Sequence, residues 1–102
     1  MIKVSRGCLG SEELEEVKSA FEYGYFGLAF KVDEFEEALK SYIGASYVVA
    51  TNTGTTALHL ALDALGIGPG DEVIVPSLTF VASFQAISAT GAKPVSCDIH
   101  PD

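Results

Sequence analysis

Apolar residues recur at helical spacing in two segments of the first 45 residues of this chain. The first predicted helix begins at Ser11, which can cap it, and carries Glu12 and Glu13 in its first turn, where acidic side chains are favourable. Gly24 is predicted to end this helix. The second helix is predicted over residues 32–43 and is followed by another glycine.

After residue 46 the pattern alternates between short apolar runs and helical spacing. Strands are predicted at residues 47–50, 72–75 and 95–98, and helices from residue 57 and over residues 81–89. The run 72–75 is almost continuously apolar, which is typical of a strand covered on both faces. This alternation predicts the α/β class, with mostly parallel strands joined by right-handed crossovers.

Two polar loops follow predicted strands, at residues 51–56 and 77–80. In α/β sheets, ligands bind at the carboxyl ends of strands, where these loops lie. Residues 51–56 are small, polar and uncharged, and a helix begins there, so unpaired amides and the helix dipole favour an anion. Gly54 allows close approach to the backbone, and the threonine hydroxyls add donors. The alternative is an ordinary N-capped helix after a strand.

Length and charge restrict the classes of function. The 102 residues suit one small domain, and 48% of them are hydrophobic, which permits a core. The net charge of −8 argues against binding to nucleic acid or to anionic membrane surfaces. Residues 73–92 are uncharged and long enough to span a bilayer, but they include Pro76, Gln85 and Gly91. They are therefore interpreted as a strand, a loop and a helix.

The reactive residue types show no recognised site. Cys8 and Cys97 are far apart in the sequence, which suits a reduced cytosolic protein, and the N-terminus lacks the apolar segment of a signal peptide. We therefore expect a cytoplasmic protein. His59 and His100 have no neighbours at metal-ligand spacing, so no metal site is expected. Neither standard glycine-rich nucleotide loop is present.

Two stretches closely resemble the DegT/StrS-type aminotransferases: TNTGTTALHLAL at residues 51–62 and GPGDEVIVPSLTFVA at residues 68–82. These are fold-type I enzymes that depend on pyridoxal 5'-phosphate (PLP), and most transfer an amino group to a keto sugar attached to a nucleotide. Their sequences are several times longer. The resemblance therefore implies that residues 1–102 are an N-terminal fragment of the large, PLP-binding domain, with the C-terminal remainder absent.

The resemblance also implies roles for single residues. Gly54, Thr55 and Thr56 match the turn that holds the PLP phosphate, and Phe80 matches the aromatic residue that stacks on the pyridine ring. The alternative for Phe80 is a core aromatic that opens the next helix. Residues 25–29 match a segment near the substrate, although Ala29 stands where the family often has glycine. The substrate-binding residues expected from this match are Tyr25, Phe26 and Gly27.

By the same resemblance, the lysine that binds PLP and the carboxylate that pairs with its ring nitrogen lie beyond residue 102. No lysine of this chain matches, so no catalytic residue is expected here. The expected partners are a nucleotide-sugar substrate and glutamate as amino donor, and the full-length form is expected to be a homodimer. The alternatives are a PLP-dependent sugar dehydratase of the same family and a non-catalytic binding or regulatory module.

The resemblance also makes a prediction about the order of the strands. Residues 72–75 are expected to pair in parallel with residues 95–98, and residues 47–50 are expected to pair with neither.

Overall fold

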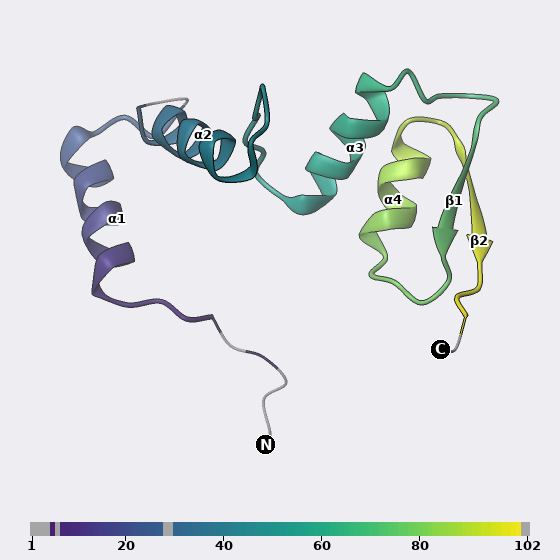
Figure 1. Ribbon diagram of the computed structural model, residues 1–102, viewed down its shortest axis with the longest axis horizontal. Helices are drawn as coiled ribbons and strands as arrows, with labels where there is room; N and C mark the ends of the chain where they lie inside the picture. Colours follow the sequence, from purple (N-terminus) through teal and green to yellow (C-terminus); the bar gives the residue numbers. More distant parts are fainter. Residues whose placement is uncertain (1–4, 6, 28–29, 101–102) are drawn as a thin grey trace. The chain divides into compact units, whose positions relative to one another are not determined.

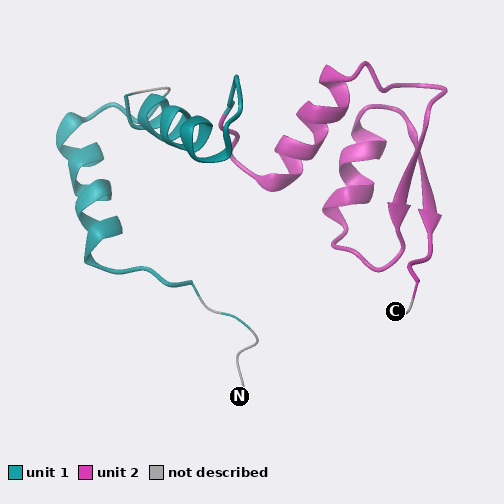
Figure 2. Ribbon diagram, in the orientation of Figure 1, with its two compact units in different colours: residues 1–49 teal, residues 50–102 magenta. Residues whose placement is uncertain are grey.

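The computed structural model describes residues 5, 7–27 and 30–100, and the chain divides into two compact units, Met1–Val49 and Ala50–Asp102 (Figure 2). The elements form an α/β arrangement, as predicted (Figure 1). In chain order they are α1 (Ser11–Tyr23), α2 (Phe30–Ile43), α3 (Gly54–Ala64), β1 (Glu72–Pro76), α4 (Ala82–Ala89) and β2 (Lys93–Cys97).

The first helix, α1, is capped differently from the prediction. Its N-cap is Gly10, so the prediction that Ser11 caps it is wrong. The physical reason is that the Leu14 amide donates to the Gly10 carbonyl at 3.4 Å, so the first turn already includes Ser11, and the carboxylate of Glu13 reaches back and accepts a hydrogen bond from the Gly10 amide at 2.6 Å. This hydrogen bond lowers the pKa of Glu13 below its ordinary value of 4.5. Gly24 ends the helix with a φ of 75°, as predicted.

The helices α1 and α2 of the first unit are joined by a charged side chain. The Nζ atom of Lys31 in α2 lies 2.6 Å from Oε2 of Glu16 in α1 and 3.1 Å from Oε2 of Glu34. The hydrogen bond to Glu16 is the main reason why the pKa of Lys31 is raised. Neither helix has a buried residue, so this unit has no core of its own among the described residues.

The second unit contains a parallel β-α-β arrangement. The strands β1 and β2 pair in parallel with Glu72 opposite Lys93 and Val75 opposite Ser96, which confirms the predicted pairing. The strand β2 begins at Lys93, earlier than predicted, because the Lys93 amide already donates to the carbonyl of Asp71 at 2.9 Å.

The predicted strand at residues 47–50 is not present, so that prediction is wrong for this structure. A strand exists only where its backbone pairs with a neighbour, and the sheet of the described residues contains β1 and β2 alone. The segment pairs with neither of them, as the expected strand order requires.

Helix α4 supplies most of the core of the second unit. Its residues Ala82, Ala86 and Ile87 are buried, together with Val75 of β1 and Ala92 before β2. The small side chains of α4 let its backbone approach its neighbours closely. Partly buried side chains complete this cluster: Leu62, Ile67, Val73 and Phe84.

The uncharged run at residues 73–92 forms most of β1, a loop and α4, as interpreted from the sequence. Within the part of the chain that the structure describes, no helix combines the length and apolar character needed to cross a bilayer.

Among the described glycines, Gly91 leaves the least room for a β-carbon. Its φ is 85°, and a β-carbon at this position would lie 2.9 Å from Cγ of Pro69. We therefore expect Gly91→Ala to reduce the free energy of unfolding by about 1–3 kcal/mol, because it adds a steric contact to a left-handed backbone conformation. Urea denaturation measures this change.

The matched control for this substitution is Gly68→Ala. A β-carbon at Gly68 meets its nearest atom, the carbonyl oxygen of Thr90, at an ordinary 3.7 Å. Equal denaturation midpoints for the two variants contradict the expected strain at Gly91.

Candidate functional site

The turn before α3 is held by its own side chains. The Oγ1 atom of Thr53, the N-cap residue, accepts a hydrogen bond from the Thr56 amide at 3.1 Å. The hydroxyl of Thr56 donates to Oδ1 of Asn52 at 3.0 Å. The amide of Ala57 donates to the Thr53 carbonyl, so α3 begins at Gly54, before the apolar spacing starts. The hydroxyls of Thr53 and Thr56 therefore stabilise the turn.

The amides of Gly54 and Thr55 remain available at the start of α3. Among the described residues, neither amide donates a hydrogen bond, and the Thr55 hydroxyl has no partner either. A β-carbon placed on Gly54 would meet no atom within 4 Å, so this side of the backbone is accessible. These donors lie at the positive end of the α3 dipole, which favours an anion.

A hollow of about 480 Å³ lies between the starts of α3 and α4. It is lined by Gly54, Thr55, Leu58, Phe80, Ala82 and Ser83. The structure thus brings together three of the four cofactor-binding residues expected from the sequence. Thr56, the fourth, does not line the hollow, because its hydroxyl turns back to Asn52.

Phe80 lies in the loop after β1, immediately before α4. Its carbonyl accepts a hydrogen bond from the Ser83 amide at 3.1 Å, which ties this residue to the first turn of α4. The side chain is 77% exposed, so Phe80 is not a core aromatic in this structure. One side of the hollow therefore offers an accessible aromatic ring.

No ionisable side chain lines the hollow. An anion would therefore meet no carboxylate there, and it would be bound by amide and hydroxyl donors and by the helix dipole. This donor set, beside an accessible ring, fits a ligand that carries a phosphate group on a flat aromatic ring. Ser83, which the sequence reasoning missed, also faces the hollow. Its spacing from Phe80, about one helical turn, was the signal that could have identified it.

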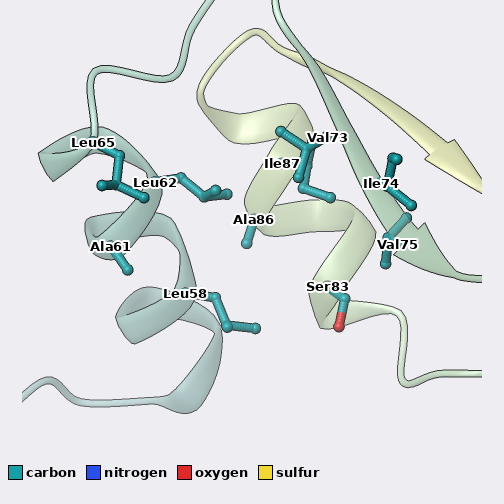
Figure 3. A pocket seen from close by; sticks show the side chains of 10 residues that line it. All are labelled: Leu58, Ala61, Leu62, Leu65, Val73, Ile74, Val75, Ser83, Ala86 and Ile87. Atoms are coloured by element: carbon teal, nitrogen blue, oxygen red, sulfur yellow. The ribbon is translucent and has the colours of Figure 1, made fainter.

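A second, apolar groove of about 230 Å³ lies between α3, α4 and β1 (Figure 3). It is lined by Leu58, Ala61, Leu62, Leu65, Val73, Ile74, Val75, Ser83, Ala86 and Ile87. The oxygen of Ser83, at the start of α4, is the only heteroatom among the side chains drawn in Figure 3. The other side chains that line this groove have no hydrogen-bond donor for an anion. The hollow at the starts of α3 and α4 is therefore the better candidate for binding a phosphate group.

The lysines that the structure describes are all paired with carboxylates. The Nζ atom of each lies within 4.0 Å of a glutamate carboxylate: Lys18 of Glu15, Lys31 of Glu16 and Glu34, Lys40 of Glu37, and Lys93 of Glu72. A hydrogen bond to Glu72 is the main reason why the pKa of Lys93 is raised. A raised pKa keeps the amines of Lys31 and Lys93 charged, and charged amines are poor nucleophiles. Lys3 lies outside the described residues.

Among the described residues, no three histidine, cysteine, aspartate or glutamate side chains form a group that could hold a metal ion. His59 lies on α3, and its Nε2 atom is 3.4 Å from Oδ2 of Asp63, one turn further along the same helix.

The expected substrate-binding residues lie in the first unit. Tyr25 and Phe26 are 58% and 71% exposed, and the Phe26 ring meets Phe21 edge to face, with centroids 5.4 Å apart. A β-carbon at Gly27 would lie 3.0 Å from the Tyr25 hydroxyl, so a larger residue there would displace the Tyr25 ring. Residues 28–29, which include Ala29, lie outside the described residues.

Comparison with known proteins gives consistent matches. The sequence profile of the DegT/DnrJ/EryC1/StrS aminotransferase family matches residues 7–102. The chain is 59% identical over 68 residues to the GDP-perosamine synthase of Caulobacter vibrioides, which covers 67% of this chain and 18% of that protein. It is 40% identical over 103 residues to the dTDP-4-dehydro-2,3,6-trideoxy-D-glucose 4-aminotransferase of Saccharopolyspora spinosa, covering 99% of this chain and 27% of that protein.

A solved structure shares the fold over nearly the whole chain. Spr1654 from Streptococcus pneumoniae, in its PLP form, matches with a TM-score of 0.91 and 39% sequence identity, over 99% of this chain and 26% of that one. The chain thus spans about a quarter of the length of these relatives or less.

The geometry of the turn predicts different effects for two neighbouring threonines. Thr53→Ala removes the acceptor of the Thr56 amide, and we expect it to lower the free energy of unfolding by about 1 kcal/mol. Thr55→Val removes a hydroxyl without a partner in the described structure, and it is the matched control with little expected effect. Urea denaturation of both variants tests this, and an equal loss of stability contradicts the assignment of the cap.

Proposed function

The chain belongs to the DegT/DnrJ/EryC1/StrS aminotransferase family, and on this premise we propose that it is the N-terminal segment of a PLP-dependent aminotransferase acting on nucleotide-linked keto sugars. Residues 1–102 are then part of the large, PLP-binding domain. The names of two relatives, which refer to a GDP-linked and a dTDP-linked sugar, support this substrate class.

The hollow at the starts of α3 and α4 is the observation that carries the proposal. It brings Gly54, Thr55 and Phe80 together in one place. In the proposed enzyme, the amides of Gly54 and Thr55 and the Thr55 hydroxyl bind the PLP phosphate, and Phe80 packs on the pyridine ring. When bound, PLP supplies an electron sink for chemistry at the carbon that carries the amino group.

The residues of this chain hold and orient the cofactor. Thr56 takes part by keeping the turn in shape, and its hydroxyl reaches a phosphate only if it leaves Asn52. The proposed enzyme obtains its catalytic lysine from outside this chain, since the described lysines are held in ion pairs.

The substrate is proposed to lie near Tyr25, Phe26 and Gly27 of the first unit. The exposed faces of the two rings support this, since sugars and nucleotide bases pack on accessible aromatic side chains. Glutamate as amino donor, a homodimeric full-length enzyme and a cytoplasmic location complete the proposal.

Incubation of the complete protein with PLP, glutamate and a nucleotide-linked keto sugar tests this function. Mass spectrometry is expected to detect the amino sugar and an equal amount of 2-oxoglutarate. Loss of a hydroxyl from the sugar without incorporation of nitrogen identifies a dehydratase and contradicts the proposal. Absence of any conversion across GDP-linked and dTDP-linked keto sugars contradicts it as well.

Substitution of Thr55 tests the phosphate site. In the complete protein, Thr55→Val is expected to weaken PLP binding by about 1–3 kcal/mol, because a hydrogen bond to a charged group is lost. Thr55→Ser keeps the hydroxyl and is expected to keep most of the affinity. Titration followed by PLP absorbance measures both dissociation constants, and unchanged affinity in Thr55→Val argues against the role of this hydroxyl.

Reductive labelling tests whether a lysine of this chain is the amine that binds PLP covalently. The purified 102-residue chain is mixed with PLP and borohydride, and the labelled peptides are mapped. Sparse labelling spread over several lysines is expected, since those described are paired with carboxylates. A single lysine labelled almost completely, with turnover of a keto sugar, shows that this chain is a complete enzyme.

A further inference from the structure

We propose that Ser83 is a second hydroxyl ligand of the PLP phosphate, facing Thr55 across the hollow. This inference rests on the proposed function, because it concerns the same cofactor site.

The lining of the hollow contains two hydroxyl side chains, and they come from different helices. Thr55 belongs to the first turn of α3, and Ser83 belongs to the first turn of α4. The other lining side chains, those of Leu58, Phe80 and Ala82, are apolar. A phosphate bound at the α3 amides therefore finds its remaining side-chain donor on α4.

The position of Ser83 is fixed by the core. Its neighbour Ala82 is buried, as are Ala86 and Ile87 further along α4, so this helix cannot shift without disturbing the core. The Ser83 amide donates to the carbonyl of Phe80 at 3.1 Å. The serine and the proposed stacking ring therefore form one structural unit, and a ligand that packs on Phe80 lies close to the Ser83 side chain.

The hydroxyl of Ser83 is also available as a donor. Its partner is the Thr79 hydroxyl, with Oγ and Oγ1 3.4 Å apart, and either group can donate. This separation exceeds the usual 2.7–2.8 Å between hydroxyl oxygens by roughly 0.6 Å, so the hydrogen bond is weak. When Thr79 donates to Ser83, the Ser83 hydroxyl can donate to a phosphate oxygen, which is the stronger, charged acceptor.

The test compares PLP with pyridoxal, which lacks the phosphate, in the complete protein. Ser83→Ala is expected to weaken PLP binding about tenfold and to leave pyridoxal binding unchanged, because the lost hydrogen bond goes to the phosphate. Ser83→Thr keeps a hydroxyl and is expected to keep the preference for PLP. Ser88→Ala is the matched control, since Ser88 is an exposed serine on the same helix.

Two results would overturn the inference: unchanged PLP affinity in Ser83→Ala, or an equal loss of affinity for PLP and pyridoxal. Thermal denaturation of each variant shows whether it folds. If Thr55→Val weakens PLP binding and Ser83→Ala does not, only the role of Ser83 fails. If neither substitution changes PLP affinity, the proposed cofactor site fails as well.

Discussion

The packing of α4 against β1 and β2 is the constraint on which the second unit depends. Two parallel strands cannot be joined by a tight turn, and here the crossover is α4, whose buried face contacts both of them. Ala82 and Ala86 allow a close approach, and Ile87 joins Val75 and Ala92 in the core. The start of α4 is therefore held at the carboxyl end of β1. Phe80 and Ser83 take their positions from that packing.

The start of α3 shows how neighbouring residues of similar chemistry take different roles. The hydroxyls of Thr53 and Thr56 are used within the turn, whereas the amides of Gly54 and Thr55 are left for a ligand. The hollow contains no charged side chain, so its affinity for an anion depends on oriented amides, hydroxyls and the helix dipole. Such a site keeps its donors at all pH values at which the protein is folded.

The two units differ in how much apolar surface they bury. The second unit has a small core, whereas α1 and α2 expose large apolar side chains such as Phe21 at 67% and Tyr42 at 88%. Apolar side chains exposed to this extent are typical of surfaces that pack against other parts of a protein or a partner. In the proposed enzyme, which is several times longer than this chain, further segments would cover them.

Features that depend on neighbouring residues could be predicted from the amino-acid sequence. Helical spacing, Gly24 and the apolar run at residues 72–75 located the helices and β1, and the resemblance of residues 51–62 and 68–82 indicated the family and the strand pairing. Which threonine hydroxyl is available to a ligand could not be predicted, because it depends on competing hydrogen bonds in the folded chain: the Thr56 hydroxyl donates to Asn52, and the Thr55 hydroxyl remains available. The folded chain also brings Ser83 to the hollow, which the sequence did not reveal, since α3 and α4 are far apart in the sequence and meet through the core. For the same reason residues 47–50 form no strand, because a β-prone run requires a paired neighbour that periodicity does not reveal.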